Sequence, residues 1–100
     1  MSEVLSLKEA KDLIESKLCI VFDARNFTGL NTLTYWGKPW VEIHWHEEQK
    51  KEGFWMDIRP SETAKGFLYS SYYQQITMNE VLAKLGQYFK ERVQLSLFDD

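Results

Sequence analysis

The chain has 100 residues, a length that suits one small domain with a single hydrophobic core. Hydrophobic residues make up 44% and charged residues 27%, which is the balance of a globular domain and not of a disordered segment. The net charge of -3 excludes a general attraction to nucleic acid, so we expect no direct nucleic-acid partner. The 15% aromatic content is high, and large rings allow a short chain to close its core.

Cysteine content and terminal sequence indicate the compartment. Cys19 is the only cysteine, which excludes an intramolecular disulfide, and its position in the apolar run 18–22 predicts a buried thiol. The first residues lack the basic start and apolar core of a signal peptide. No apolar stretch approaches the roughly 20 residues needed to cross a bilayer. We therefore expect a cytoplasmic protein without a membrane partner.

A helix followed by a strand is predicted for the first part of the chain. Ser6 and Glu9 have the spacing of a capping box, in which each side chain satisfies the other residue's backbone N–H. Behind them Leu7, Ala10 and Ile14 recur at helical spacing, which predicts a helix from about residue 7 to 17. The apolar run 18–22 then has the length of a buried strand.

The middle of the chain predicts a meander of three antiparallel strands. Residues 26–31 are expected to form a loop, residues 32–36 are β-prone, and residues 37–39 are typical of a turn. Two segments then alternate between apolar and polar residues, as half-buried strands do. Their predicted inward-facing residues are Val41, Ile43 and Trp45 in the first segment and Phe54, Met56 and Ile58 in the second.

The last third of the chain predicts a second helix. Residues 60–66 form a connection, and residues 67–76 suit either a strand or a helix. Thr77 and Glu80 form a second capping box, followed by an apolar stripe that extends to about Arg92. Gly86 within this stripe is expected to permit close packing on the sheet.

These elements together predict an α+β fold with two layers. A three- to four-stranded antiparallel sheet is flanked by an N-terminal and a C-terminal helix. Residues 1–92 are expected to form this single domain, and residues 93–100 an extended C-terminal tail that serves as a docking peptide.

The tail carries the most specific motif of the sequence, Gln94-Leu95-Ser96-Leu97-Phe98. It resembles the short peptide by which many bacterial replication and repair proteins bind the β sliding clamp, whose pattern is Gln, Leu, Ser or Asp, then Leu-Phe. The resemblance covers these five residues and implies a bacterial sliding clamp as partner. It implies that Leu97 and Phe98 enter an apolar pocket and that Gln94 enters a smaller one. The alternative is that the tail pairs with the sheet as a final edge strand.

A second candidate site lies on one face of the strand at residues 40–46. Glu42, His44 and His46 point the same way, because side chains at alternate positions of a strand share a face. Two histidines and a carboxylate are part of a metal or acid–base site, yet a further ligand would have to come from Asp57 or another acid. A solvated sheet face explains the pattern as well, so we expect no bound metal.

Arg25, Trp36 and Trp40 form a third candidate, since they lie near the predicted strand ends. Exposed Trp and Arg side chains are common anchors of protein interfaces, so these residues are a candidate secondary interaction surface. The alternative is that both Trp rings cap the core at the edge of the sheet.

The sequence contains no nucleophile elbow, no Gly-rich phosphate loop and no paired-cysteine motif, so neither catalysis nor a cofactor is expected. The expected function is that of a small non-catalytic adaptor or regulator of DNA replication or repair that docks on the clamp, with a phage- or plasmid-type clamp competitor as a variant. A second protein partner of the domain stays unidentified. The alternative is a small ligand- or metal-binding domain, with enzymatic activity or without it, that uses the face of Glu42, His44 and His46.

Overall fold

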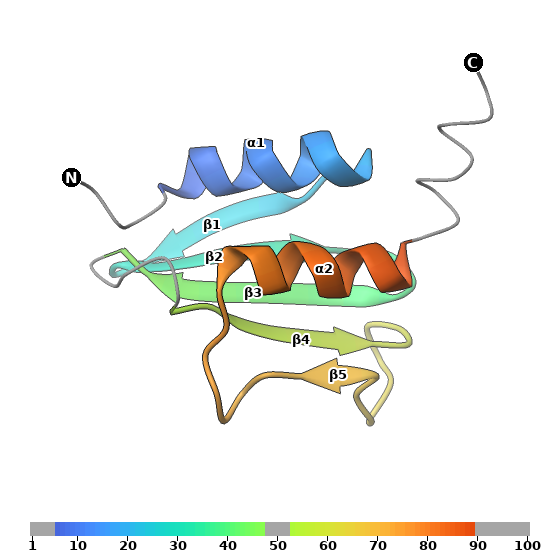
Figure 1. Cartoon of the computed structure of the whole chain (residues 1–100). Helices are drawn as coiled ribbons and strands as arrows, with labels where there is room; N and C mark the ends of the chain where they lie inside the picture. The colour runs from blue at the N-terminus through green and yellow to red at the C-terminus, as the bar shows by residue number, and fades with distance from the viewer. Residues whose placement is uncertain (1–5, 48–52, 90–100) are drawn as a thin grey trace, which may run out of the picture.

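The computed structural model, which describes residues 6–47 and 53–89, has two helices on one face of an antiparallel sheet (Figure 1). The elements in chain order are α1 (Leu7–Leu18), β1 (Asp23–Phe27), β2 (Leu30–Tyr35), β3 (Trp40–His46), β4 (Trp55–Arg59), β5 (Tyr69–Ser70) and α2 (Met78–Tyr88). The five strands are ordered in the sheet as they are in the chain. The predicted α+β class is confirmed, with five strands where three to four were expected.

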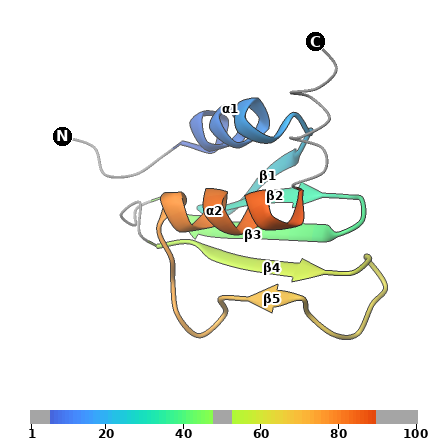
Figure 2. The same ribbon diagram turned by 45° about the vertical axis from the view of Figure 1, so that its right-hand side comes forward.

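The core lies between the helices and the sheet. Figure 2 shows both helices on the same side of the strands, which leaves the other face of the sheet without a helix from the described residues. The alternation predicted for the two central strands is confirmed, because all six predicted inward-facing side chains are at most 1% exposed. The helices contribute Ala10, Ile14, Leu18, Val81 and Leu85 to the same core.

Both helices begin at the predicted capping boxes. In α1 the Glu9 backbone N–H donates to Ser6 Oγ at 3.1 Å, and the Ser6 N–H donates to Glu9 Oε1 at 3.0 Å. Thr77 and Glu80 make the equivalent pair at α2, with distances of 3.1 and 2.9 Å. Each box satisfies two N–H groups that a helix start leaves without partners. The predicted end of the second helix, near residue 92, lies outside the described residues.

The strand predicted at residues 18–22 is wrong. Leu18 is the last residue of α1, and Cys19 follows in the left-handed conformation with φ 58°. The N–H of Phe22 donates to the carboxylate of Glu15 at 2.7 Å instead of to a neighbouring strand. The run is apolar because Ile20 and Phe22 enter the core below α1. Cys19 is exposed, which corrects the expected burial of its thiol.

The loop predicted at residues 26–31 is instead the tip of a hairpin between β1 and β2. Thr28 and Gly29 form its turn, with φ values of 48° and 91°. Positive φ at both turn positions matches the right-handed twist of the flanking strands. Asn26 and Asn31 pair across the strands, with Asn26 Nδ2 donating to Asn31 Oδ1 at 2.7 Å. The polar residues that suggested a loop therefore form a cross-strand contact.

The ambiguous segment 67–76 contains only the short strand β5. Tyr69 pairs with Ile58, and Ser70 pairs with Asp57, at the edge of the sheet. Ile76 makes an isolated bridge with Phe54 just before α2. Gly86 in α2 does not approach the sheet, since a Cβ built there has no atom within 4 Å. The expected role of Gly86 in close packing is therefore wrong. Neither helix in the described residues combines the length and the apolar character that a membrane span needs.

Candidate functional site

The open face of the sheet is the face that the two described helices leave uncovered. Strand registers place Glu42 opposite Asp57 and His44 opposite Trp55 on this face. Thr32 and Thr34 of β2 lie opposite His44 and Glu42, so each of these cross-strand pairs continues onto β2. Successive residues of a strand point to opposite faces, so these side chains share the open face and lie side by side. Thr34 is buried, and the other side chains are partly exposed.

Two hollows adjoin Asp57 on the open face. The first has a volume of about 320 Å³ and is lined by Leu30, His44, His46, Trp55, Asp57 and Tyr72. The second has a volume of about 420 Å³ and is lined by Asp57, Phe67, Ser70, Tyr72 and Tyr73. Asp57 and Tyr72 belong to both, so one carboxylate lies between two cavities whose walls are mostly aromatic.

Two carboxylates lie directly opposite each other at this point. Side chains at opposed positions of an antiparallel pair have Cβ atoms about 5 Å apart, and like charges there are unfavourable. Ser70 Oγ donates to Asp57 Oδ1 at 2.6 Å, and Asp57 makes no ion pair with any described residue. Among the described residues, the ion-pair contact of Glu42 is with His44, whose Nε2 lies 3.6 Å from Glu42 Oε1. Within the described residues, the two opposed carboxylates make no ion pair with a Lys or Arg side chain.

Glu42, His44 and His46, the candidate metal ligands, do not form a metal site in the described part of the chain. His44 Nδ1 lies 3.0 Å from Thr32 Oγ1, so that ring nitrogen already has a partner. The ring of His46 lies edge-on to Trp55, with centroids 5.5 Å apart. Within residues 6–47 and 53–89, no group of three His, Cys, Asp or Glu side chains is placed to hold a metal ion.

Arg25 and Trp36 are brought together by a shared partner, and Trp40 contacts Trp36. Arg25 Nε lies 3.1 Å from Asp23 Oδ2, and Trp36 Nε1 donates to the same oxygen at 3.4 Å. Trp36 lies edge-on to Trp40, with ring centroids 6.0 Å apart. Trp36 is 55% exposed and Trp40 only 6%, so Trp36 and Arg25 form the accessible part of this surface.

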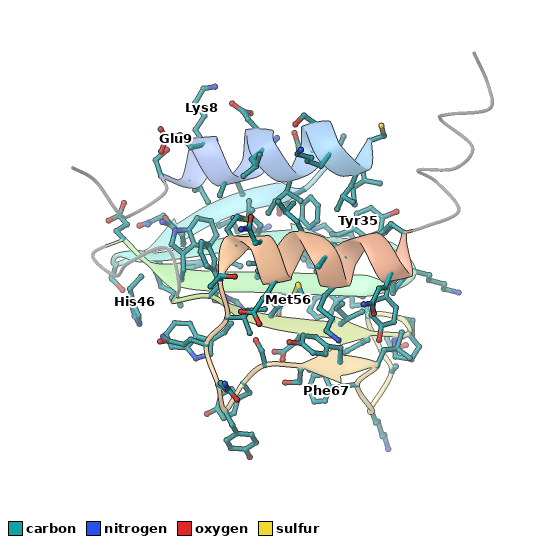
Figure 3. The ribbon with its side chains drawn as sticks, viewed as in Figure 1. Lys8, Glu9, Tyr35, His46, Met56 and Phe67 are labelled. Atoms are coloured by element: carbon teal, nitrogen blue, oxygen red, sulfur yellow. The ribbon has the colours of Figure 1, made fainter. Side chains whose placement is uncertain are left out.

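A third hollow lies where the described chain ends. Its volume is about 460 Å³, and it is lined by Val21, Phe22, Asp23, Tyr35, Trp36 and Gly37. Val21 is 76% exposed, which is unusual for a large apolar side chain. Tyr35 contacts Phe89, the last described residue, with ring centroids 5.1 Å apart, and Figure 3 shows Tyr35 beside the end of α2. The apolar hollow and the exit of the chain are therefore adjacent.

The proposed docking peptide, Gln94 to Phe98, lies outside the described residues. Phe67, Tyr72 and Tyr73 are functional candidates that the sequence did not single out, because their role depends on where β5 pairs with β4. The available signal was the density of aromatic residues in the segment 67–76, which has no regular period.

No protein-family model matches the sequence, and comparison with curated proteins and with solved structures gave no match.

Proposed function

We propose that the protein binds a bacterial sliding clamp through Gln94–Phe98 and acts as a small non-catalytic adaptor or regulator in DNA replication or repair. The observation that carries this proposal is the tail sequence, which fits the clamp-binding pattern at every position. A pattern of this length appears by chance in about one of 10³ to 10⁴ chains of this size. Coincidence is therefore the less favoured explanation.

The interaction follows the physics of a peptide in a groove. Burial of Leu97 and Phe98 contributes roughly 3–6 kcal/mol. Ordering the peptide offsets part of this gain, so a single motif binds with a dissociation constant in about the micromolar range. Such a contact exchanges readily, as required of a protein that shares a clamp with polymerases or competes with them.

The short connection between domain and peptide supports a close arrangement. Phe89 is 2% exposed and packs against Tyr35, which anchors the end of the described chain in the core. Only residues 90–93 separate it from Gln94, and a fully extended chain spans at most about 18 Å from Phe89 to Gln94. A clamp bound to the peptide therefore keeps the domain against its own surface. This favours steric competition, or a second contact near Val21 and Trp36, over loose recruitment.

The test measures binding of the intact protein to a purified bacterial sliding clamp. The double substitution Leu97→Ala/Phe98→Ala removes both apolar anchors, and we expect it to weaken binding by at least about 100-fold. Ser96→Asp is the matched control, because the pattern accepts either residue, and it should retain the native affinity. Equal binding by the native protein and the double variant, or no binding by either, would contradict the proposal.

A further inference from the structure

The open face already holds one cation between aromatic rings. The guanidinium carbon of Arg59 lies 5.3 Å from the centre of the Trp40 ring and 4.9 Å from that of Phe67. Arg59 Nε is buried without a hydrogen-bond partner, so the rings supply the surroundings of this part of the group. Such cation–π contacts strengthen when the cation is removed from water. The domain thus uses its own aromatic side chains to bind a guanidinium group.

The neighbouring hollows offer similar rings and additional carboxylates. Trp55, His46 and Tyr72 line the first hollow, and Phe67 and Tyr73 extend the aromatic wall into the second. No Lys or Arg of the described chain lines either one. The site beside Asp57 therefore has the rings that suit a guanidinium group but no cation from these residues.

Two carboxylates beside the first hollow favour binding of a cation there. Glu42 and Asp57 oppose each other across β3 and β4, an unfavourable pairing that a positive group between them would relieve. Ser70 Oγ donates to Asp57 Oδ1, while Asp57 Oδ2 accepts no hydrogen bond and makes no ion pair among the described residues. Arg59 stacks on Trp40 and Phe67 and makes no ion pair with Asp57.

We propose that the open face binds an arginine side chain presented by a protein partner, with the guanidinium group against Trp55 and Tyr72 and paired with Asp57. A guanidinium group fits better than an ammonium group, because it is planar, stacks on rings and pairs with a carboxylate through a fork of N–H groups. The carboxylates disfavour a nucleic-acid backbone, whose phosphates they would repel. This inference is independent of the clamp-binding tail.

The exposed rim identifies the partner as a protein surface. Tyr72 is 66% exposed, Tyr73 96% and Phe67 51%, and all three border the second hollow. Exposed aromatic side chains around a charged pocket are typical anchors of protein interfaces. A small ligand would occupy the hollow and leave these three rings in water, whereas a partner surface would cover them.

The experiment titrates the intact protein with capped tripeptides and follows the amide and Trp indole signals by NMR. The probes are acetyl-Gly-Arg-Gly-amide and its neutral citrulline analogue, with a lysine analogue as a third probe. The arginine peptide should shift the signals of Trp55, Asp57 and Tyr72 at concentrations in about the millimolar range, since one side chain binds weakly. The lysine peptide should bind less tightly, and the citrulline peptide should cause no shift.

Asp57→Asn tests the role of the carboxylate and should weaken the arginine peptide about tenfold or more. Asp12→Asn is the matched control, because Asp12 is an exposed carboxylate on α1 and pairs with Lys8 at 2.9 Å. Tyr72→Ala removes an exposed wall of the hollow without touching the core and should also weaken binding. The spectrum of each variant reports directly whether it is folded.

Three results would overturn the inference. Equally tight binding of the citrulline and arginine peptides would show that charge is not recognised. Tighter binding of free arginine than of the capped peptide would indicate a small ligand in place of a protein partner. Shifts on the open face with a single-stranded oligonucleotide, and none with the arginine peptide, would indicate nucleic acid.

Discussion

The two faces of the sheet differ although they are built from the same strands. In β3, Ile43 is fully buried under the helices, whereas the side chains of its neighbours Glu42 and His44 on the open face are 30% and 26% exposed. Apart from Asn31, the covered face is apolar, because burial of an unpaired polar group costs free energy. Glu42 and Asp57 on the open face are only partly buried, so opposed carboxylates are tolerated there. Along β3, residues that stabilise the core therefore alternate with residues of the open face, where we propose the arginine site.

The largest expected effect comes from removing a side chain of the covered face. Ile43→Ala leaves a cavity in a fully buried position and should lower the free energy of unfolding by about 2–5 kcal/mol. His44→Ala, one residue away, removes mainly the contact with Thr32 Oγ1 and should cost about 1 kcal/mol. Denaturant unfolding of both variants measures the difference. Equal losses would show that the open face contributes to folding as much as the core does.

The contrast between the faces also explains what the sequence could predict. Alternation in residues 40–46 and 54–58 and the two capping boxes are local signals, and the structure confirms them. The hairpin at Thr28-Gly29 was missed because Asn26 and Asn31 look like loop residues until they pair. The strand predicted at residues 18–22 was wrong because a connection whose side chains fill the core is as apolar as a buried strand.

The candidate sites depended on contacts that no local pattern reveals. The sequence placed Glu42, His44 and His46 on one face, but the position of Asp57 opposite Glu42 follows from strand register. Phe67, Tyr72 and Tyr73 gather near Asp57 only because β5 pairs with β4. Asp23 and Arg25 are neighbours on β1, whereas Trp36 reaches Asp23 from the connection after β2, a contact that spacing along the chain does not encode.

A second prediction concerns Gly86 in α2, one of the two helices that cover the sheet. Gly86→Ala adds a methyl group in the interior of α2, where a Cβ meets no atom within 4 Å. Because Ala favours a helix over Gly, the free energy of unfolding should rise by up to about 1 kcal/mol, measured by denaturant unfolding. Gly37→Ala is the contrasting variant: a Cβ there would lie 2.5 Å from the Tyr35 ring and should destabilise the protein. A loss of stability in Gly86→Ala would restore the predicted close packing of this residue.

The smallest expected effect tests whether repulsion between the opposed carboxylates of the open face lowers the stability of the fold. Glu42→Gln removes the repulsion with Asp57 and keeps the shape of the side chain, so the free energy of unfolding should rise by about 0.2–1 kcal/mol. Denaturant unfolding of the variant and of the native protein under the same conditions measures the change. Glu62→Gln is the control, since Glu62 is exposed and makes no ion pair with a described residue.

The same variant links this comparison to the proposed arginine site. If the opposed carboxylates are retained for a cation, Glu42→Gln should gain stability and at the same time weaken the arginine tripeptide. A loss of stability would mean that the surroundings of Glu42 already favour its charge, and the argument from uncompensated repulsion would fail. A gain in stability with unchanged peptide binding would confine the site to Asp57 and its rings. Because stability and binding are measured on one variant, the two contributions of the open face can be separated.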